Sequence, residues 1–285
     1  MGIISNKRYG SERALYGIEN TVVENCRFEG EEDGESALKE SRAITVKNCF
    51  FDLRYPLWHS KSLKLENCEM TENCRAALWY DKDAIISDSK LNGIKALREC
   101  KNVSIKNCEI HSPEFGWKSS GLGLKDVTLD SEYAFLESRN VFIDKLNFNG
   151  KYSFQYVKNV IIKNSVLNTK DAFWHAKNVT AENCVLDGEY IGWYSEGLTL
   201  LRCHIKGTQP FCYCKNLKLI NCEMVDTDLA FEKSEVEAVI TTRVDSIKNP
   251  LSGHIQVQEL GELIMDDPDA KGQVLVMEQK NQNGS

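Results

Sequence analysis

One pattern, an apolar pair followed by Asn-Cys, returns along this sequence at a nearly constant spacing. It reads KNVSIKNCEI from Lys101, and the same register recurs in the segments that end at Leu186 and Met224. If the residue after the Asn is called the anchor, the sequence numbers of most successive anchors differ by 19. A period this constant over about thirteen units is typical of a solenoid. The anchors are Cys26, Cys49, Cys68, Ser89, Cys108, Val127, Leu146, Ser165, Cys184, Cys203, Cys222, Thr241 and Leu260.

Within each unit, the apolar positions lie five and three residues before the anchor, as Val103 and Ile105 do. This period of two predicts a strand with one buried face. The anchor and the residue two beyond it are again apolar or thiol-bearing, so the inward positions shift by one at the intervening Asn. We therefore expect a corner there, because Asn tolerates the left-handed backbone conformation. A second corner of Asn or Gly is expected six residues before the anchor, and Gly93 and Gly150 mark a third turn.

Three strands and three corners in about 19 residues describe one coil of a three-sided parallel β-helix. A helical repeat is disfavoured, because most units lack room for two helices and are rich in β-branched residues. The predicted fold class is therefore all-β, a solenoid of about 13 coils.

Three recurring segments, PLWH at 56–59, ALWY at 77–80 and FWHA at 173–176, join the Asn corners as features of this sequence. In these features the chain resembles the bacterial domain-of-unknown-function 3737 family, a group of pectin-lyase-like β-helices. The resemblance covers nearly the whole chain. It implies a right-handed, single-stranded parallel β-helix with a ladder of Asn side chains, and it implies no established reaction.

The continuous repeat predicts a single elongated domain over residues 1–279. Residues 1–13 precede the first recognised copy, and we expect them to cap the solenoid, since an open end exposes strand edges. The acidic insert GEEDGES at 30–36 is expected to project as a loop. Two additional residues between successive anchors predict a smaller bulge at 72–75.

Towards the C-terminus the Asn corners disappear while apolar pairs continue, beginning at Val236, Ile255 and Val274. The sequence numbers of these residues again differ by 19, so residues 231–279 are predicted to form weaker coils and a C-terminal cap. The last residues, 280–285, are predicted to be disordered.

The net charge of the 285-residue chain is −7, which argues against a nucleic-acid partner, because such a partner requires a basic stripe. No run of about 18 apolar residues predicts a membrane span, so no membrane partner is expected. The start, MGIISNKRYG, lacks the apolar stretch of a secretory signal, and we therefore expect a cytoplasmic protein.

Seven of the eleven cysteines occupy anchor positions and are expected to face the core. Neighbouring anchors lie one coil apart, which is within bridging distance, but buried free thiols are the better interpretation in a reducing compartment. Cys212 and Cys214 have the spacing of a metal-binding pair, yet no second Cys or His pair accompanies them. No metal and no cofactor are predicted.

The third strand of each coil, eight to eleven residues after the anchor, carries the most individual side chains. Position +11 is small or thiol-bearing, and alternation then turns position +9 inward, where Trp58, Trp117, Trp174 and Trp193 predict a stacked aromatic core. The sequence leaves open whether this Trp column instead faces solvent, where Trp58, Trp174 and Trp193 would be binding residues.

The same alternation turns positions +8 and +10 outward, and an exposed aromatic stripe marks an interaction surface. The candidate binding residues at position +10 are His59, Tyr80, Lys118, Tyr156, His175, Tyr194 and Tyr213, and those at position +8 include Phe154 and Phe173. In the resembled superfamily this face binds polysaccharides, which implies that the Tyr and His rings stack on, and hydrogen-bond to, successive sugar rings.

Three functions follow from this stripe. The first is a non-catalytic protein that binds a carbohydrate or a protein, including its own copy. The second is a pectin-lyase-like glycoside hydrolase, with Glu99 and Glu137 as acid and base two coils apart, roughly 9.5 Å between backbones. Lys118 lies between them and opposes the acid role, and an exposed Glu-Lys-Glu ladder is the structural alternative. The third function is a structural or oligomerising rod with the stripe buried in a dimer.

Overall fold

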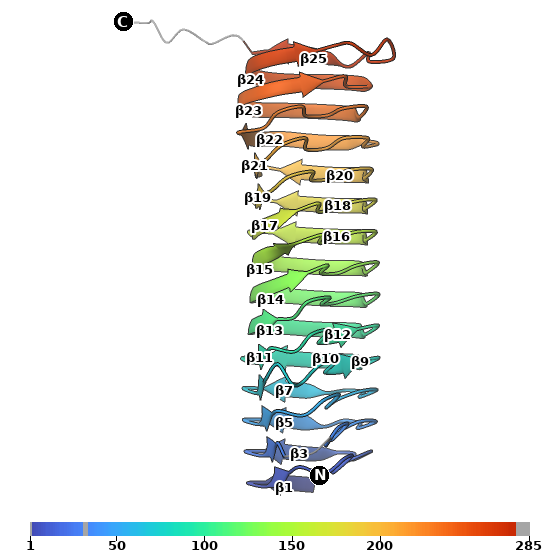
Figure 1. Cartoon of the computed structure of the whole chain (residues 1–285), viewed down its shortest axis with the longest axis vertical. Coiled ribbons are helices and arrows are strands. Elements are labelled where there is room, and N and C mark those ends of the chain that lie inside the picture. Colours follow the sequence, from blue (N-terminus) through green and yellow to red (C-terminus); the bar gives the residue numbers. More distant parts are fainter. Residues whose placement is uncertain (1, 31–33, 278–285) are drawn as a thin grey trace, which may run out of the picture. The chain divides into compact units, whose positions relative to one another are not determined.

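The computed structural model describes residues 2–30 and 34–277. The chain divides into two compact units, Met1–Val160 and Ile161–Ser285, and the boundary falls within strand β16 (Lys158–Lys163). Strands pair in parallel in each unit, so the predicted class, an all-β right-handed parallel β-helix, is confirmed (Figure 1). The extent of a single domain over 1–279 stays a prediction.

In the unit Met1–Val160, strands of the first side precede each Asn corner and strands of the second side follow it (Figure 1, blue to green). First-side strands are β1 (Gly2–Ser5), β3 (Thr21–Glu24), β5 (Thr45–Lys47), β7 (Lys64–Glu66) and β10 (Lys82–Ser87). Second-side strands are β2 (Arg8–Tyr9), β4 (Arg27–Phe28), β6 (Phe50–Phe51), β8 (Glu69–Met70) and β11 (Lys90–Leu91). Three longer strands run through both sides: β13 (Lys101–His111), β14 (Ser120–Glu132) and β15 (Arg139–Lys151). Two short strands lie on the third side: β9 (Leu78–Trp79) and β12 (Leu97–Arg98).

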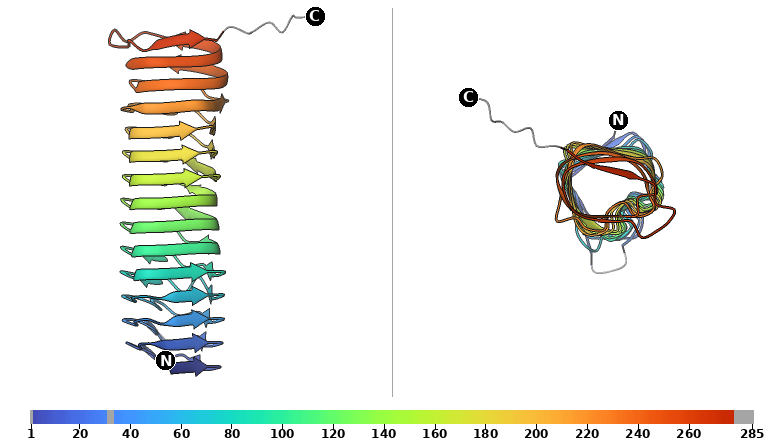
Figure 2. Two further views of the ribbon diagram at one scale, coloured as in Figure 1. Left: turned by 180° about the vertical axis from the view of Figure 1, so that it is seen from behind. Right: turned by 90° about the horizontal axis from the view of Figure 1, so that it is seen from above.

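The unit Ile161–Ser285 has the same organisation of strands. Its strands are β17 (Val166–Lys170), β18 (Lys177–Glu182), β19 (Val185–Asp187), β20 (Glu196–Leu201), β21 (His204–Lys206), β22 (Leu217–Val225), β23 (Glu235–Lys248), β24 (Ser252–Ile264) and β25 (Gln273–Val276). The last three strands, orange to red in Figure 2, form successive layers of this unit.

The strand register reproduces the spacing of the repeat. Val103 pairs with Leu122, so β13 and β14 are paired at a sequence offset of 19. Lys64 pairs with Ile85, an offset of 21 that accommodates the bulge predicted at 72–75. The larger insert at 30–36 includes residues 31–33, which lie outside the described residues, as does the tail 280–285.

The chain begins with a regular coil, because β1 already pairs with β3, and the capping role of residues 1–13 stays a prediction. Gly2 pairs with Thr21 and Ser5 with Glu24, again at an offset of 19. Asn6 then turns the corner with a φ of 54°. Sequence analysis missed this copy because Lys7, rather than a Cys or an apolar residue, stands at its anchor.

The C-terminal coils are also spaced differently from the prediction. Ala238, not Val236, pairs with Ile255, so the offset between β23 and β24 is 17 at this point. This coil is two residues shorter than its neighbours, and the pairing shifts again after Ile240. The final predicted spacing is confirmed, since Ile255 pairs with Val274 at an offset of 19.

Both predicted Asn corners adopt the left-handed conformation. At the corner before the anchor, Asn25, Asn48 and Asn67 have φ values of 52°, 53° and 49°. Their side chains also contact one another, because Asn67 Nδ2 donates to Asn48 Oδ1 at 2.8 Å and Asn48 Nδ2 donates to Asn25 Oδ1 at 3.3 Å. The corner six residues before the anchor is left-handed as well, for example at Asn102 and Gly121.

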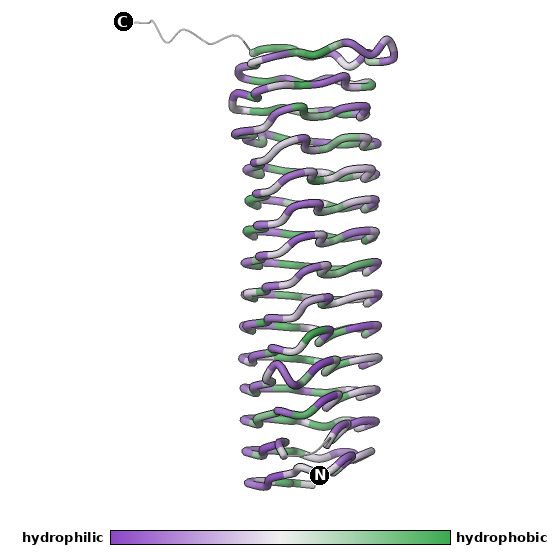
Figure 3. Tube along the Cα trace, in the orientation of Figure 1, coloured by the Kyte–Doolittle hydropathy of each residue, from purple (hydrophilic) through white to green (hydrophobic). Residues whose placement is uncertain are grey.

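The core includes the inward residues of the two sheet sides, and Figure 3 shows hydrophobic and hydrophilic residues alternating along the coils. Val103, Ile105, Cys108 and Ile110 are buried on β13, while the residues between them face outward. Burial of this apolar surface is the main stabilising term of such a fold. Among the described residues, no helix is long and apolar enough to cross a membrane.

Candidate functional site

The third side of each coil is not the regular strand that the period of two predicts. Apart from β9 and β12, its residues form turns, and in the coils from Glu114 to Lys233 φ is positive at every second position. Tyr133, Phe135 and Glu137 have φ values of 56°, 63° and 56° in one coil. Positive φ is uncommon for bulky residues, so the stacking of neighbouring coils must hold this conformation in place.

This backbone changes which residues face the core. Position +8 is buried: Phe135, Phe154 and Phe173 are 0% exposed. The prediction that Phe154 and Phe173 lie on an exposed stripe was therefore wrong. In these three coils positions +9 and +10 both turn outward before position +11 returns to the core, because the left-handed residue at +10 breaks the alternation that a strand would have. Cys212, at position +9 of a later coil, is buried instead.

A stacked aromatic core does exist, but it is built from Phe at position +8 rather than from Trp at position +9. The rings of Phe135 and Phe154 lie 4.8 Å apart and within 15° of parallel in the first unit. In the second unit Phe211, at position +8, stacks at 6.0 Å on Phe231, which lies nine residues after Cys222 because this coil is one residue longer. These buried rings contribute no surface to a partner.

The Trp column instead lies half-buried at the surface. Trp58 and Trp79 stack at 5.2 Å in the first unit, and Trp174 and Trp193 stack at 5.6 Å in the second. Each indole also donates its N–H to a backbone carbonyl of the next coil, as Trp193 Nε1 does to Gln209 O at 2.8 Å. One edge of each ring is thus tied to the backbone.

The rings at position +10 stack on one another in the same way. His59 and Tyr80 are 4.8 Å apart in the first unit. In the second unit Tyr194 lies 5.0 Å from His175 and 4.8 Å from Tyr213, in both cases within 9° of parallel. The ring faces contact neighbouring rings, so the faces that would stack on sugars are already occupied. The polar ring edges remain at the surface, and Tyr194 is 44% exposed.

The candidate acid and base, Glu99 and Glu137, both lie at the surface of the first unit, on coils separated by that of Lys118. Backbone bonds order the three coils: Glu99 N–H donates to Trp117 O at 2.8 Å, and Lys118 N–H to Leu136 O at 2.8 Å. Glu99 is 3.6 Å from the guanidinium of Arg98. That guanidinium in turn lies 5.0 and 5.3 Å from the ring centres of Trp79 and Trp117, so Glu99 takes part in a cation–aromatic cluster.

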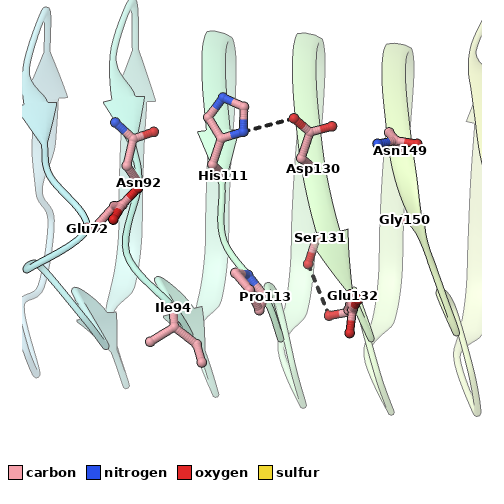
Figure 4. A pocket seen from close by; sticks show the side chains of 10 residues that line it. All are labelled: Glu72, Asn92, Ile94, His111, Pro113, Asp130, Ser131, Glu132, Asn149 and Gly150. Carbon is pink, nitrogen blue, oxygen red and sulfur yellow. Dashed lines mark hydrogen bonds and ion pairs between the residues drawn. The ribbon is translucent and has the colours of Figure 1, made fainter.

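The first unit also contains a groove of about 530 Å³ beside the third side of its coils (Figure 4). Its lining residues come from the third turn of successive coils. They are Glu72, Asn92, Ile94, His111, Pro113, Asp130, Ser131, Glu132, Asn149 and Gly150. Gly150 is required here, because a Cβ at this position would lie 1.9 Å from the carbonyl oxygen of Ser131.

One wall of the groove repeats polar residues three positions after the anchor. Asn92, His111, Asp130 and Asn149 follow one another coil by coil, and Figure 4 shows their side chains in a row. Because β13 pairs with β14 in register, His111 lies directly beside Asp130. The spacing between such neighbours is about 4.8 Å, the distance between paired strands.

His111 connects two carboxylates at this wall. Its Nδ1 is 2.8 Å from Asp130 Oδ2, and its Nε2 is 3.2 Å from Glu109 Oε1. The hydrogen bond from His111, assisted by the charge of Lys90, lowers the pKa of Glu109. The other end of the groove is also charged, since Lys151 Nζ lies 3.0 Å from Glu132 Oε1.

Aromatic side chains border the groove. Tyr133 follows Glu132 in the chain, is 40% exposed, and stacks on Tyr152 at 4.7 Å. Trp117 donates its indole N–H to the backbone carbonyl of Tyr133. The groove, the two Tyr rings and the indole are therefore neighbouring parts of one surface.

Sequence analysis did not identify the groove. The only signal was the sequence of residues three positions after the anchor, where Asn92, His111, Asp130 and Asn149 are all polar. The described residues contain no group of three or more His, Cys, Asp or Glu side chains arranged to hold a metal ion. Cys212 and Cys214 are both buried.

Comparison with solved structures gives parallel β-helix proteins at low sequence identity. The surface adhesin PfbA of Streptococcus pneumoniae has a TM-score of 0.41 and 11% identity, over 81% of this chain and 70% of that chain. The A-module of mannuronan C-5 epimerase AlgE6 of Azotobacter vinelandii has a TM-score of 0.40 and 8% identity, over 98% and 91%. The tailspike of E. coli bacteriophage HK620 has a TM-score of 0.45 and 7% identity, over 91% and 60%.

No curated protein matches the chain. A family described as "Protein of unknown function (DUF3737)" matches residues 2–277, which include the coils of both units. The chain therefore belongs to the DUF3737 family.

Proposed function

We propose that this protein binds a carbohydrate without cleaving it, and that the groove of the first unit is the binding site. The observation that carries this proposal is the row of Asn92, His111, Asp130 and Asn149 along a groove of about 530 Å³. Ligand sites are typically concave and contain a few convergent polar groups.

The chemistry of the wall favours a polyhydroxylated ligand. A sugar hydroxyl both donates and accepts hydrogen bonds; an Asn amide does both, and an Asp carboxylate accepts. Equivalent residues recur at about 4.8 Å from coil to coil, so successive hydroxyls of an extended oligosaccharide would meet successive side chains. The exposed ring of Tyr133, stacked on half-buried Tyr152, supplies apolar surface next to these polar groups.

The outward residues at position +10 supply further proposed contacts in each unit. His59, Tyr80 and Lys118 belong to the first unit, as does Tyr156, which is 50% exposed. Because stacking occupies the ring faces of His59 and Tyr80, we propose that they contact ligand through their ring edges, by hydrogen bonds. His175, Tyr194 and Tyr213, with the half-buried Trp174 and Trp193, offer the same edges in the second unit.

Titration of the full chain against a panel of oligosaccharides by isothermal calorimetry tests the proposal. We expect saturable binding of one sugar class, and Asp130→Asn and His111→Ala should each weaken it about tenfold or more, since hydrogen bonds to charged groups contribute roughly 1.5–3 kcal/mol. His204→Ala is the matched control, because His204 forms a similar pair with Glu223 at 3.0 Å in the second unit and does not line the groove.

Binding that survives both groove substitutions would contradict the groove as the site. Absence of binding across the panel would contradict the proposed ligand class, and would direct the search to protein partners.

We also propose a cytoplasmic location. Its support is the burial of all eleven cysteines as free thiols, which suits a reducing compartment. Cell fractionation followed by immunoblotting tests it, and recovery in the secreted fraction would contradict it.

A further inference from the structure

The first side of the Met1–Val160 unit carries a concentration of positive charge. We define the basic face as the outward residues of six segments of the first side. These segments are residues 42–47, 61–66, 82–87, 101–106, 120–125 and 139–144. The face contains nine Lys or Arg side chains and only three carboxylates, in a chain whose net charge is −7. The cations are Arg42, Lys47, Lys61, Lys64, Lys82, Lys101, Lys106, Lys125 and Arg139, and the carboxylates are Glu66, Asp83 and Asp144.

The cations of the basic face are stacked on one another. Arg42 pairs with Lys61, Lys61 with Lys82, and Lys82 with Lys101, so four cationic residues follow in register. A second set lies at the other edge of the sheet, where Lys106 pairs with Lys125. Like charges directly opposite each other destabilise a sheet, so this arrangement opposes folding and suggests an external anionic partner.

Most of these cations form no ion pair with another described residue. Lys47 Nζ lies 2.8 Å from Glu24, and Arg42 is 3.9 Å from Glu19. The other seven cations of the face form no ion pair with any residue in 2–30 or 34–277. The three carboxylates of the face are too few to balance them.

Apolar side chains lie between the two sets of cations. Ile85 on β10 and Phe142 on β15 each point outward and are 48% exposed. Between their strands is Gly123 on β14, where an added Cβ would meet no atom within 4 Å. The face is therefore a sheet surface about 16 Å wide and 24 Å high, with an apolar centre and cationic edges.

We propose that the basic face binds the surface of an anionic lipid bilayer. A bilayer supplies what both parts of the face require, since anionic headgroups attract Lys and Arg and the acyl boundary accommodates exposed apolar side chains. A single linear polyanion would pair with one row of cations and would leave Ile85 and Phe142 in water. The cations occupy two dimensions of a sheet face, which matches a planar partner.

Sedimentation of the full chain with phosphatidylcholine vesicles, with and without phosphatidylserine, tests this inference. We expect binding only when phosphatidylserine is present, and weaker binding as salt increases. The triple variant Lys82→Glu, Lys101→Glu, Lys106→Glu should bind about a hundredfold or more weakly, because each Lys near an anionic surface contributes appreciably and reversal adds repulsion.

A second triple variant, Lys90→Glu, Lys145→Glu, Lys151→Glu, is the matched control. It changes the net charge equally, but its three Lys side chains lie off the basic face, beside Glu109, Asp126 and Glu132. It should retain most of the vesicle binding. Phe142→Ala should reduce binding about tenfold if the ring enters the acyl boundary.

No binding to phosphatidylserine vesicles would overturn the proposal, and so would an equal loss in both triple variants. Vesicle binding that Phe142→Ala leaves unchanged, together with equally tight binding to heparin, would replace the bilayer by a linear polyanion as the partner. Circular dichroism of each variant confirms that the coils remain folded.

Discussion

The carboxyl of Asp81 accepts the backbone N–H of Ser60, with Oδ1 2.8 Å from the nitrogen, while Oδ2 has no hydrogen-bond partner among the described residues. Asp81 is 0% exposed. Other coils place Ser at this position: Ser119 and Ser138 accept the N–H of the preceding coil at 3.1 and 3.0 Å. Asp81 therefore accepts the same hydrogen bond as Ser does in the other coils. Unlike Ser, it also buries a second oxygen, Oδ2, that has no hydrogen-bond partner among the described residues.

We expect Asp81→Ser to stabilise the protein at neutral pH. The Ser hydroxyl can accept the Ser60 N–H, and the substitution removes a buried unpaired oxygen whose cost is about 1–3 kcal/mol. Chemical denaturation of both proteins measures the difference in the free energy of unfolding. Equal or lower stability of the variant would mean that Oδ2 is satisfied in solution.

The gain from Asp81→Ser should depend on pH. Burial raises the pKa of Asp81 well above its ordinary value, and the hydrogen bond from the Ser60 N–H only partly opposes this effect. The folded state therefore favours the neutral carboxyl. The contribution of the neutral Asp81 carboxyl to the free energy of unfolding is complete below the unfolded pKa of about 3.9. It is lost as pH rises through the folded pKa. The stability difference between variant and wild type should grow from pH 4 upward.

The burial of position +8 gives a second stability prediction. Phe154→Ala should cost about 3–5 kcal/mol, because Phe154 is 0% exposed and stacks on Phe135. The same substitution at Phe142, which is 48% exposed, should cost much less. Thermal unfolding of the two variants compares them directly. Similar losses at both positions would contradict the assignment of Phe154 to the core.

The corners were predictable from sequence because the property that makes them is local. Asn25 or Asn102 adopts a positive φ that Asn tolerates in any context, so residue type and spacing were sufficient. The repeat length was predictable from the same columns of Asn corners and anchor residues. The predicted spacing failed only where these columns are interrupted. At Lys7 the anchor is polar, and between Ala238 and Ile255 a coil loses two residues.

The third side was not predictable by the same argument. Phe135 and Glu137 adopt positive φ although their residue types disfavour it, because stacking on neighbouring coils determines the backbone there. The assumption of a strand therefore placed Phe154 outside and Trp174 inside. The groove was missed for a related reason. It depends on which turn residues remain exposed after stacking, and neither His111 nor Asp130 belongs to a recognisable motif.

Glu99→Gln separates binding from catalysis. Glu99 contacts Arg98, whose guanidinium lies between two indoles, and this pair is partly exposed. Loss of such an ion pair should change the free energy of unfolding by less than about 1 kcal/mol. If the protein binds without cleaving, carbohydrate affinity should also change little. Polysaccharide cleavage by the wild type that Glu99→Gln or Glu137→Gln abolishes, measured by release of reducing sugar, would instead establish a glycoside hydrolase.

The cysteines provide a final prediction, about reactivity. All eleven are buried free thiols, and burial raises the pKa of Cys74 and of Cys212 to about 12 and that of Cys214 to about 11. A hydrogen bond from Cys203 lowers the pKa of Cys222 to about 7, but this side chain is 0% exposed, so access limits its reaction. We expect the native protein to react slowly with Ellman's reagent and all eleven thiols to react in denaturant. Rapid labelling of several thiols in the native state would contradict their burial, and would mean that the coils open readily in solution.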